Sequence, residues 1–119
     1  MWIKLEEVFQ ELNLPYSRQG SYANNDDIPD SLFTFWNTDS PDTWFFDNES
    51  HRVEWEWVVY FYTKDPAILY TKMEEFITMA RAKGFLVDGN GKDIVADVPD
   101  YVGRYVRLTY VENKDDMEA

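Results

Sequence analysis

Cysteine is absent from this chain of 119 residues, and histidine occurs only once. Without cysteine, neither a disulfide framework nor a thiolate metal site can form. The single histidine, His51, has no neighbouring nucleophile and no second histidine or cysteine that could complete a metal site. We therefore expect no bound metal and no cofactor, and we interpret His51 as an incidental surface residue.

Long hydrophobic runs are also missing. No apolar stretch approaches the roughly 20 residues that a transmembrane helix requires. The chain begins Met-Trp-Ile-Lys-Leu-Glu-Glu, which places acids where a signal peptide has a basic start and an apolar stretch. The sequence predicts a soluble protein that is made in the cytoplasm and has no contact with a membrane.

Positive charge is scarce, because 23 acidic residues stand against 11 lysines and arginines and give a net charge of −12. This excess argues against direct binding to a phosphate backbone. It is typical either of a highly solvated surface or of a surface that must not adhere to nucleic acid. We expect no direct nucleic-acid binding.

Motifs for catalysis are lacking as well. The chain has no phosphate loop, Rossmann fingerprint or nucleophile elbow. Glu54 and Glu56 share one face of a predicted strand, a geometry open to paired carboxylates, but a solvated charged strip explains them better. The segment Asp88-Gly89-Asn90-Gly91 and the following residues lack the spaced ligands and terminal glutamate of a calcium loop. We predict that the protein is not an enzyme.

Hydrophobic residues make up 45% of the chain and aromatic residues 18%, so a disordered chain is excluded despite the charge. The length suits one hydrophobic core and is too short for two. We expect a single domain over residues 1–112, followed by a flexible acidic tail over residues 113–119.

The stretch 52–63, Arg-Val-Glu-Trp-Glu-Trp-Val-Val-Tyr-Phe-Tyr-Thr, alternates and predicts a long strand. One face is wholly apolar, and the other is charged at first and then aromatic. Twelve extended residues span roughly 40 Å at about 3.3 Å each, well beyond a common strand of about 5–6 residues. We therefore expect part of this strand to leave the body of the domain. The apolar face consists of Val53, Trp55, Trp57, Val59 and Phe61.

Other patterns predict two helices and several further strands. An amphipathic helix covers residues 2–12, and a second helix begins at the Asp65-Pro66 cap and ends at Gly84. Asp88-Gly89-Asn90-Gly91 is typical of a tight hairpin turn. The further strands are predicted at residues 31–37, 44–46, 85–87, 94–98 and 104–112.

This order predicts the α+β class. We expect a single antiparallel sheet of about four to five strands, in the order α-β-β-α-β-β, with both helices packed on one face.

Aromatic residues exceed what one small core requires, with five Trp, eight Tyr and eight Phe. Aromatic side chains are enriched at protein–protein contacts. If both helices cover the apolar face of the long strand, the residues of its other face have no internal partner. A two-sided core, or long loops over these aromatics, would explain them as well. The predicted interface residues are Trp36, Trp44, Val58, Tyr60 and Tyr62.

Several segments together resemble a known family. They are Leu-Pro-Tyr at 14–16, Gly-Ser-Tyr at 20–22, Pro-Asp-Ser-Leu-Phe-Thr-Phe-Trp-Asn at 29–37, Asp-Asn at 47–48, Tyr-Phe-Tyr-Thr-Lys-Asp-Pro at 60–66, Lys-Gly-Phe at 83–85, residues 89–93 and Gly-Arg at 103–104. This run resembles small prophage-encoded proteins of Gram-positive bacteria, of the tail-terminator (tail-completion) or head–tail joining group of long-tailed phages.

The resemblance implies an α+β subunit that assembles into a ring, typically a hexamer, at the end of the tail tube, where its partners are other tail or connector proteins. Such a subunit occupies the host cytoplasm and then the virion, and can be a monomer until it meets the tail. An acidic lumen would let DNA pass without adhering. The channel-facing candidates are Asp26, Asp27, Asp39, Asp42, Glu54 and Glu56. An acidic DNA mimic, or another small phage-encoded interaction protein, is the alternative.

Overall fold

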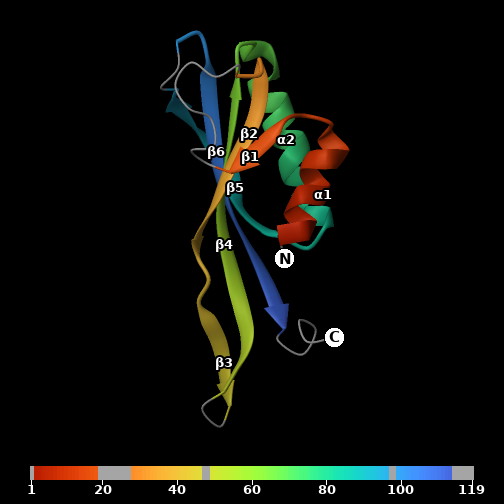
Figure 1. The fold of residues 1–119 in the computed structure, drawn as a ribbon, viewed down its shortest axis with the longest axis vertical. Coiled ribbons are helices and arrows are strands. Elements are labelled where there is room, and N and C mark those ends of the chain that lie inside the picture. Colours follow the sequence, from red (N-terminus) through yellow and green to blue (C-terminus); the bar gives the residue numbers. More distant parts are fainter. Residues whose placement is uncertain (1, 19–27, 47–48, 97–98, 114–119) are drawn as a thin grey trace.

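The computed structural model describes residues 2–18, 28–46, 49–96 and 99–113. Within these ranges the chain forms two helices and one six-stranded sheet (Figure 1). The helices are α1 (Trp2–Leu12) and α2 (Pro66–Ala82). The strands are β1 (Tyr16–Arg18), β2 (Ser31–Asp39), β3 (Asp42–Phe46), β4 (Glu49–Thr63), β5 (Leu86–Val95) and β6 (Val102–Asn113). The α+β class predicted from the sequence is confirmed.

Strand β4 is the centre of the sheet, whose order is β1-β2-β4-β6-β5. It pairs antiparallel with β2 on one side and with β6 on the other. Strand β3 pairs antiparallel with the first part of β4, on the same side as β2 but farther along. The only parallel pair among the described strands joins β1 to β2, so the sheet is mixed rather than wholly antiparallel.

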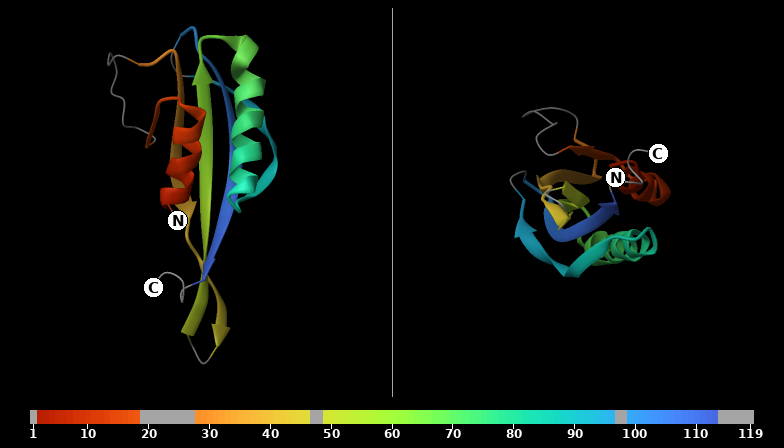
Figure 2. Two further views of the ribbon diagram at one scale, coloured as in Figure 1. Left: turned by 90° about the vertical axis from the view of Figure 1, so that its right-hand side faces the viewer. Right: turned by 90° about the horizontal axis from the view of Figure 1, so that it is seen from below.

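Both helices pack on one face of this sheet, as expected (Figure 2). The core between the layers is rich in phenylalanine: Phe9 of α1 and Phe76 of α2 contact Phe33 of β2 at ring-centroid distances of 5.3 and 5.4 Å. Phe33 in turn lies 4.7 Å from Phe61 of β4. Lys83, the residue after α2, forms ion pairs with Glu7 and Glu11 of α1 and so links the two helices.

The predicted limits of α2 are confirmed by its cap geometry. The Asp65 carboxylate accepts a hydrogen bond from the Ala67 amide at 3.0 Å, and Pro66 occupies the first turn. Beyond the helix, Gly84 has a φ of +97°, the left-handed conformation that glycine adopts most readily.

The alternation predicted along β4 is also observed. Trp57, Val59 and Phe61 are buried in the core beneath the helices, Trp55 packs half-buried against that core, and Val53 is buried outside it, at the base of the arm described below. The odd-numbered positions from Trp55 to Phe61 therefore face the core, as the apolar pattern required.

The first residues of β4 do leave the body of the domain. Together with β3 they form a two-stranded hairpin that extends beyond the ends of both helices (Figure 1). This hairpin, β3 with residues 49–53 of β4, is called the arm below. It contributes to a long shape, with principal extents of 54 × 28 × 23 Å.

The predicted hairpin at Asp88-Gly89-Asn90-Gly91 is wrong. Residues 86–95 form one strand, β5, which pairs with β6 on both sides of a bulge, where the register shifts between Asp88 and Lys92. Gly89 and Gly91 do adopt positive φ values, +72° and +93°, but they serve a bulge rather than a chain reversal. The expected strands at 85–87 and 94–98 are therefore two parts of one element.

Candidate functional site

The face of the sheet opposite the helices, called the open face below, has no helix against it in the described part of the chain (Figure 2). The strand registers place alternate residues of β2, β4 and β6 on this face. Leu32, Thr34 and Trp36 come from β2, Val58, Tyr60 and Tyr62 from β4, and Tyr105 and Arg107 from β6.

Three tyrosines form a cluster on the open face. Tyr60 and Tyr62 stack with ring centroids 6.1 Å apart and an interplanar angle of 7°, and Tyr60 lies 5.8 Å from Tyr105. Tyr62 covers Gly103, where an added Cβ would be 3.0 Å from the tyrosine ring. All three tyrosines are half-buried, so each keeps part of its side chain exposed on the open face.

The other predicted interface residues differ in accessibility. The Trp36 side chain is 49% exposed, whereas Val58, its cross-strand partner, is 4% exposed and packs within the face. The Val58 side chain is therefore covered by its neighbours and exposes little area that a partner could contact. Trp44 belongs to β3 of the arm, and its side chain lies outside the described residues.

The structure brings together three of the predicted channel-facing acids. Asp39 pairs with Glu56 across β2 and β4, and Glu54 follows two positions along the same face of β4. Asp39 is exposed, and the two glutamates are half-buried. The remaining candidates are not placed: Asp26 and Asp27 lie outside the described residues, and of Asp42 only the backbone is described, in β3.

A polar network on the helix side holds the bulge of β5. The Arg104 guanidinium forms a 2.6 Å ion pair with Asp93 and donates to the carbonyl oxygens of Asn90 and Gly91, both at 3.1 Å. It also lies over the ring of Tyr70, at 4.9 Å from the centroid. The Tyr70 hydroxyl donates to the other Asp93 oxygen at 2.7 Å.

This network shifts two pKa values. The hydrogen bond from Tyr70, with the Arg104 guanidinium beside it, lowers the pKa of Asp93 below its ordinary value. The same hydrogen bond raises the pKa of Tyr70, because the phenolate would lose its donor role and face the carboxylate. Both shifts favour the ionised carboxylate and the neutral phenol, the pairing that keeps the bulge in place.

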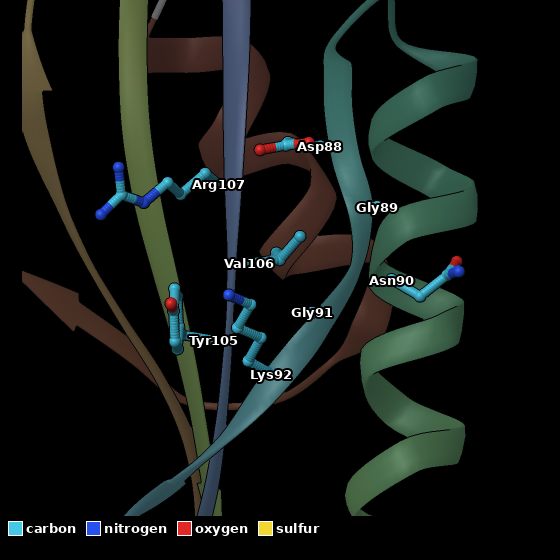
Figure 3. Close-up of a pocket in the computed structure, with 8 residues that line it drawn as sticks. All are labelled: Asp88, Gly89, Asn90, Gly91, Lys92, Tyr105, Val106 and Arg107. Atoms are coloured by element: carbon cyan, nitrogen blue, oxygen red, sulfur yellow. The ribbon is translucent and has the colours of Figure 1, made fainter.

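On the open face, the bulge borders a hollow of about 480 Å³ (Figure 3). Asp88, Lys92, Tyr105 and Arg107 extend to the same side of the β5–β6 ribbon, whereas Asn90 points the other way, towards α2. The hollow continues into the tyrosine cluster through Tyr105. Its lining includes two cations, Lys92 and Arg107, the carboxylate of Asp88 and the ring of Tyr105.

The sequence does not predict the hollow, because residues 88–91 have the composition of a turn. The Gly-Asn-Gly spacing does signal positive φ, but it fits a bulge as well as a hairpin. Cross-strand neighbours such as Lys92 and Tyr105 become visible only once β5 is known to continue along β6.

Neither described helix is long and apolar enough to cross a membrane. Within the described part of the chain, no three His, Asp or Glu side chains come together in a group that could hold a metal ion. The sequence matches no protein-family model and no curated protein.

Proposed function

We propose that this protein is a structural subunit of phage assembly, a tail terminator or head–tail joining protein that forms a ring at the end of the tail tube. The observation that carries the proposal is the arm. A two-stranded hairpin is marginally stable by itself in water, and this one extends beyond the helices that cover the rest of the sheet. Contact with a neighbouring molecule would stabilise it.

The open face supports the same proposal. Trp36 and the cluster of Tyr60, Tyr62 and Tyr105 give it an aromatic surface, the composition found at protein contacts. Repetition of one contact between two different surfaces of a subunit closes a ring. The subunit has two such surfaces, the arm and the open face.

Charge supports a role around passing DNA. Asp39, Glu54 and Glu56 lie along one stretch of the open face, and the chain as a whole carries −12. A ring that presents this stretch to its lumen repels the phosphate backbone, so that DNA slides without binding. The partners are then other tail or connector proteins, and the location is the host cytoplasm followed by the virion.

The alternative is an acidic DNA mimic. A mimic needs carboxylates along one exposed face at phosphate-like spacing. The acids placed here are divided among the open face, α1, α2 and the bulge of β5, with Glu7, Glu75 and Asp93 engaged in ion pairs. This distribution favours the assembly subunit.

The test is binding of the purified protein to tails assembled without it, observed by electron microscopy. We expect the wild-type protein to form a ring at one tail end. The double variant Tyr60→Ser with Tyr62→Ser should bind at least about tenfold more weakly, because interface tyrosines are common hot spots. Thr71→Ala, on an exposed position of α2, is the matched control and should bind like the wild type.

Absence of wild-type protein from both tail ends would refute the proposed function. A stable monomer that instead captures a DNA-binding enzyme would favour the mimic. Normal tail binding by the tyrosine variant, with normal folding by circular dichroism, would exclude the tyrosine cluster from the contact.

A further inference from the structure

Strand β5 forms one edge of the sheet. It ends the strand order β1-β2-β4-β6-β5, and among the described strands it pairs only with β6. Leu86 and Val95, at its two ends, are large hydrophobic residues that are 64% and 95% exposed. A strand edge of this kind carries unpaired backbone groups on which another strand can pair.

The bulge divides this edge into two segments that are available for pairing. Within the bulge, the carbonyl oxygens of Asn90 and Gly91 already accept hydrogen bonds from Arg104, both at 3.1 Å. Residues 86–88 and 92–95 lie on either side of the bulge in regular register with β6. Their outward-facing N–H and C=O groups are the ones that a further strand would meet.

The two segments are complementary to each other when one of them is reversed. Asp88 and Lys92 each lie two positions from Asn90, and Leu86 and Ile94 each lie four positions from it. Antiparallel pairing with a second copy, centred on Asn90, therefore places Asp88 opposite Lys92. The same register places Leu86 opposite Ile94. Directly opposite Cβ atoms are about 4.5–5.5 Å apart, a distance that suits an ion pair and an apolar contact.

The side chains also point to matching faces of the sheet. Asp88 and Lys92 extend to the same side of the β5–β6 ribbon (Figure 3). Ile94 lies on that side too, since a Cβ added to Gly103 would be 3.0 Å from its side chain. Leu86 precedes Asp88 by two positions and so shares its face. Opposite residues of an antiparallel pair lie on one face, as this register requires.

The charges of β5 and β6 are compatible with this register. Neither Asp88 nor Lys92 forms an ion pair within the described part of the chain. Arg107 is the cross-strand neighbour of Asp88 in β6, so Asp88 would lie between two cations, Arg107 of its own copy and Lys92 of the second. Asp93 is already paired with Arg104 on the helix side. No two like charges stand directly opposite each other across the two β5 strands.

The same features select the partner. Charged residues and bulges ordinarily protect an edge strand from pairing with other chains. A strand with a different charge pattern would place like charges against Asp88 or Lys92, whereas a second β5 places unlike charges against both. The symmetry of the pattern about Asn90 therefore favours another copy of this chain over an unrelated peptide.

We propose that β5 of one copy pairs antiparallel with β5 of a second copy, about a two-fold axis at Asn90, and so joins the two sheets into one. The contact is isologous, and two copies satisfy it completely. It uses neither the arm nor the tyrosine cluster. The inference therefore goes beyond the proposed function and concerns the protein in solution.

The first test is charge exchange, read as the dimer association constant of the full-length protein in sedimentation equilibrium. Asp88→Lys and Lys92→Asp should each weaken dimerisation by roughly tenfold or more, because each turns two ion pairs into two like-charge contacts. The double variant with both changes keeps the wild-type composition and net charge and is the matched control. It should dimerise within about threefold of the wild type.

A mixture of the two single variants tests the register itself. In the mixed dimer both opposite pairs again have unlike charges, so the mixture should associate roughly tenfold more tightly than either variant alone. A mixture that associates no better than its components would overturn the inference. A wild-type protein that stays monomeric at millimolar concentration would overturn it as well.

The second test uses the unaltered protein and so does not depend on the folding of any variant. Carbodiimide joins a lysine amine directly to a neighbouring carboxylate. In a mixture of unlabelled and ¹⁵N-labelled protein, we expect crosslinked peptides between Lys92 and Asp88 in which one half is labelled and the other is not. Mixed peptides that join Lys92 only to other carboxylates, or no mixed Lys92 peptide at all, would contradict the pairing.

Failure of this inference is distinguishable from failure of the proposed function. A monomeric wild-type protein that still occupies a tail end refutes the β5 dimer alone. A wild-type protein that dimerises through β5 and never occupies a tail end refutes the proposed function alone.

Discussion

Alanine at two glycines of the bulge gives a matched pair of perturbations. Gly89 and Gly91 both have positive φ, +72° and +93°. A Cβ at Gly89 would meet nothing within 4 Å, whereas a Cβ at Gly91 would lie 2.8 Å from the Tyr105 carbonyl oxygen and 3.2 Å from Arg104 Nε. The two substitutions therefore share the backbone strain and differ in the clash.

The magnitudes follow from these distances. A left-handed conformation costs a non-glycine residue about 1–2 kcal/mol, and we expect this loss for Gly89→Ala. Gly91→Ala adds an overpacking cost of about 1–3 kcal/mol, because the nearest atom is backbone that cannot rotate away. The free energy of unfolding should fall by about 2–5 kcal/mol in total for Gly91→Ala.

The assay is urea unfolding of both variants and the wild type, followed by tryptophan fluorescence and compared at a common m-value. If residues 88–91 formed a hairpin tip, both methyl groups would point into solvent and the two losses would agree. Equal losses for Gly89→Ala and Gly91→Ala would refute the close contact between the bulge and β6.

Two other substitutions probe the core and the polar network. Trp57→Ala should lower the free energy of unfolding by about 3–5 kcal/mol, because the side chain is only 5% exposed; a loss below about 1 kcal/mol in urea would contradict its place in the core. Asp93→Asn should destabilise the protein at neutral pH. The hydrogen bond from Tyr70 and the charge of Arg104 hold the folded-state pKa of Asp93 below its unfolded value. The ionised Asp93 carboxylate therefore adds to the free energy of unfolding above about pH 4, and this stabilisation is lost as the pH falls towards the folded-state pKa. The gap between the unfolding midpoints of wild type and Asp93→Asn should close on acidification, and a constant gap from pH 7 to pH 3 would contradict this.

Local chemistry explains which elements could be predicted from the sequence. The Asp65-Pro66 cap and Gly84 mark both ends of α2, and the alternation along residues 53–61 of β4 assigns its core face. Each signal depends on a residue and its immediate neighbours, so no knowledge of the rest of the fold is needed.

Long-range pairing explains what could not be predicted. β1 has three residues, too few for a periodic signal, and its parallel partner β2 lies beyond a polar segment. The bulge of β5 and a hairpin turn share the same glycine signature, and only the register along β6 distinguishes them.

On the open face, too, some features could be predicted from the local sequence and others depend on long-range pairing. Its aromatic character could be read from Tyr60 and Tyr62, but the cross-strand contact of Tyr60 with Tyr105 and the burial of Val58 depend on strand order. The interface role of these residues remains a prediction.

The central position of β4 has a consequence during synthesis on the ribosome. The backbone groups of β4 that face β2 can pair with residues already synthesised. Those that face β6 find their hydrogen-bond partners only after α2, β5 and β6 have emerged. In the interval, a nascent chain presents a long tryptophan-rich edge with open hydrogen-bonding groups, the kind of surface that invites aggregation and chaperone binding. A stalled chain that ends before Val102 should therefore be captured by chaperones, whereas a released chain that includes β6 should not.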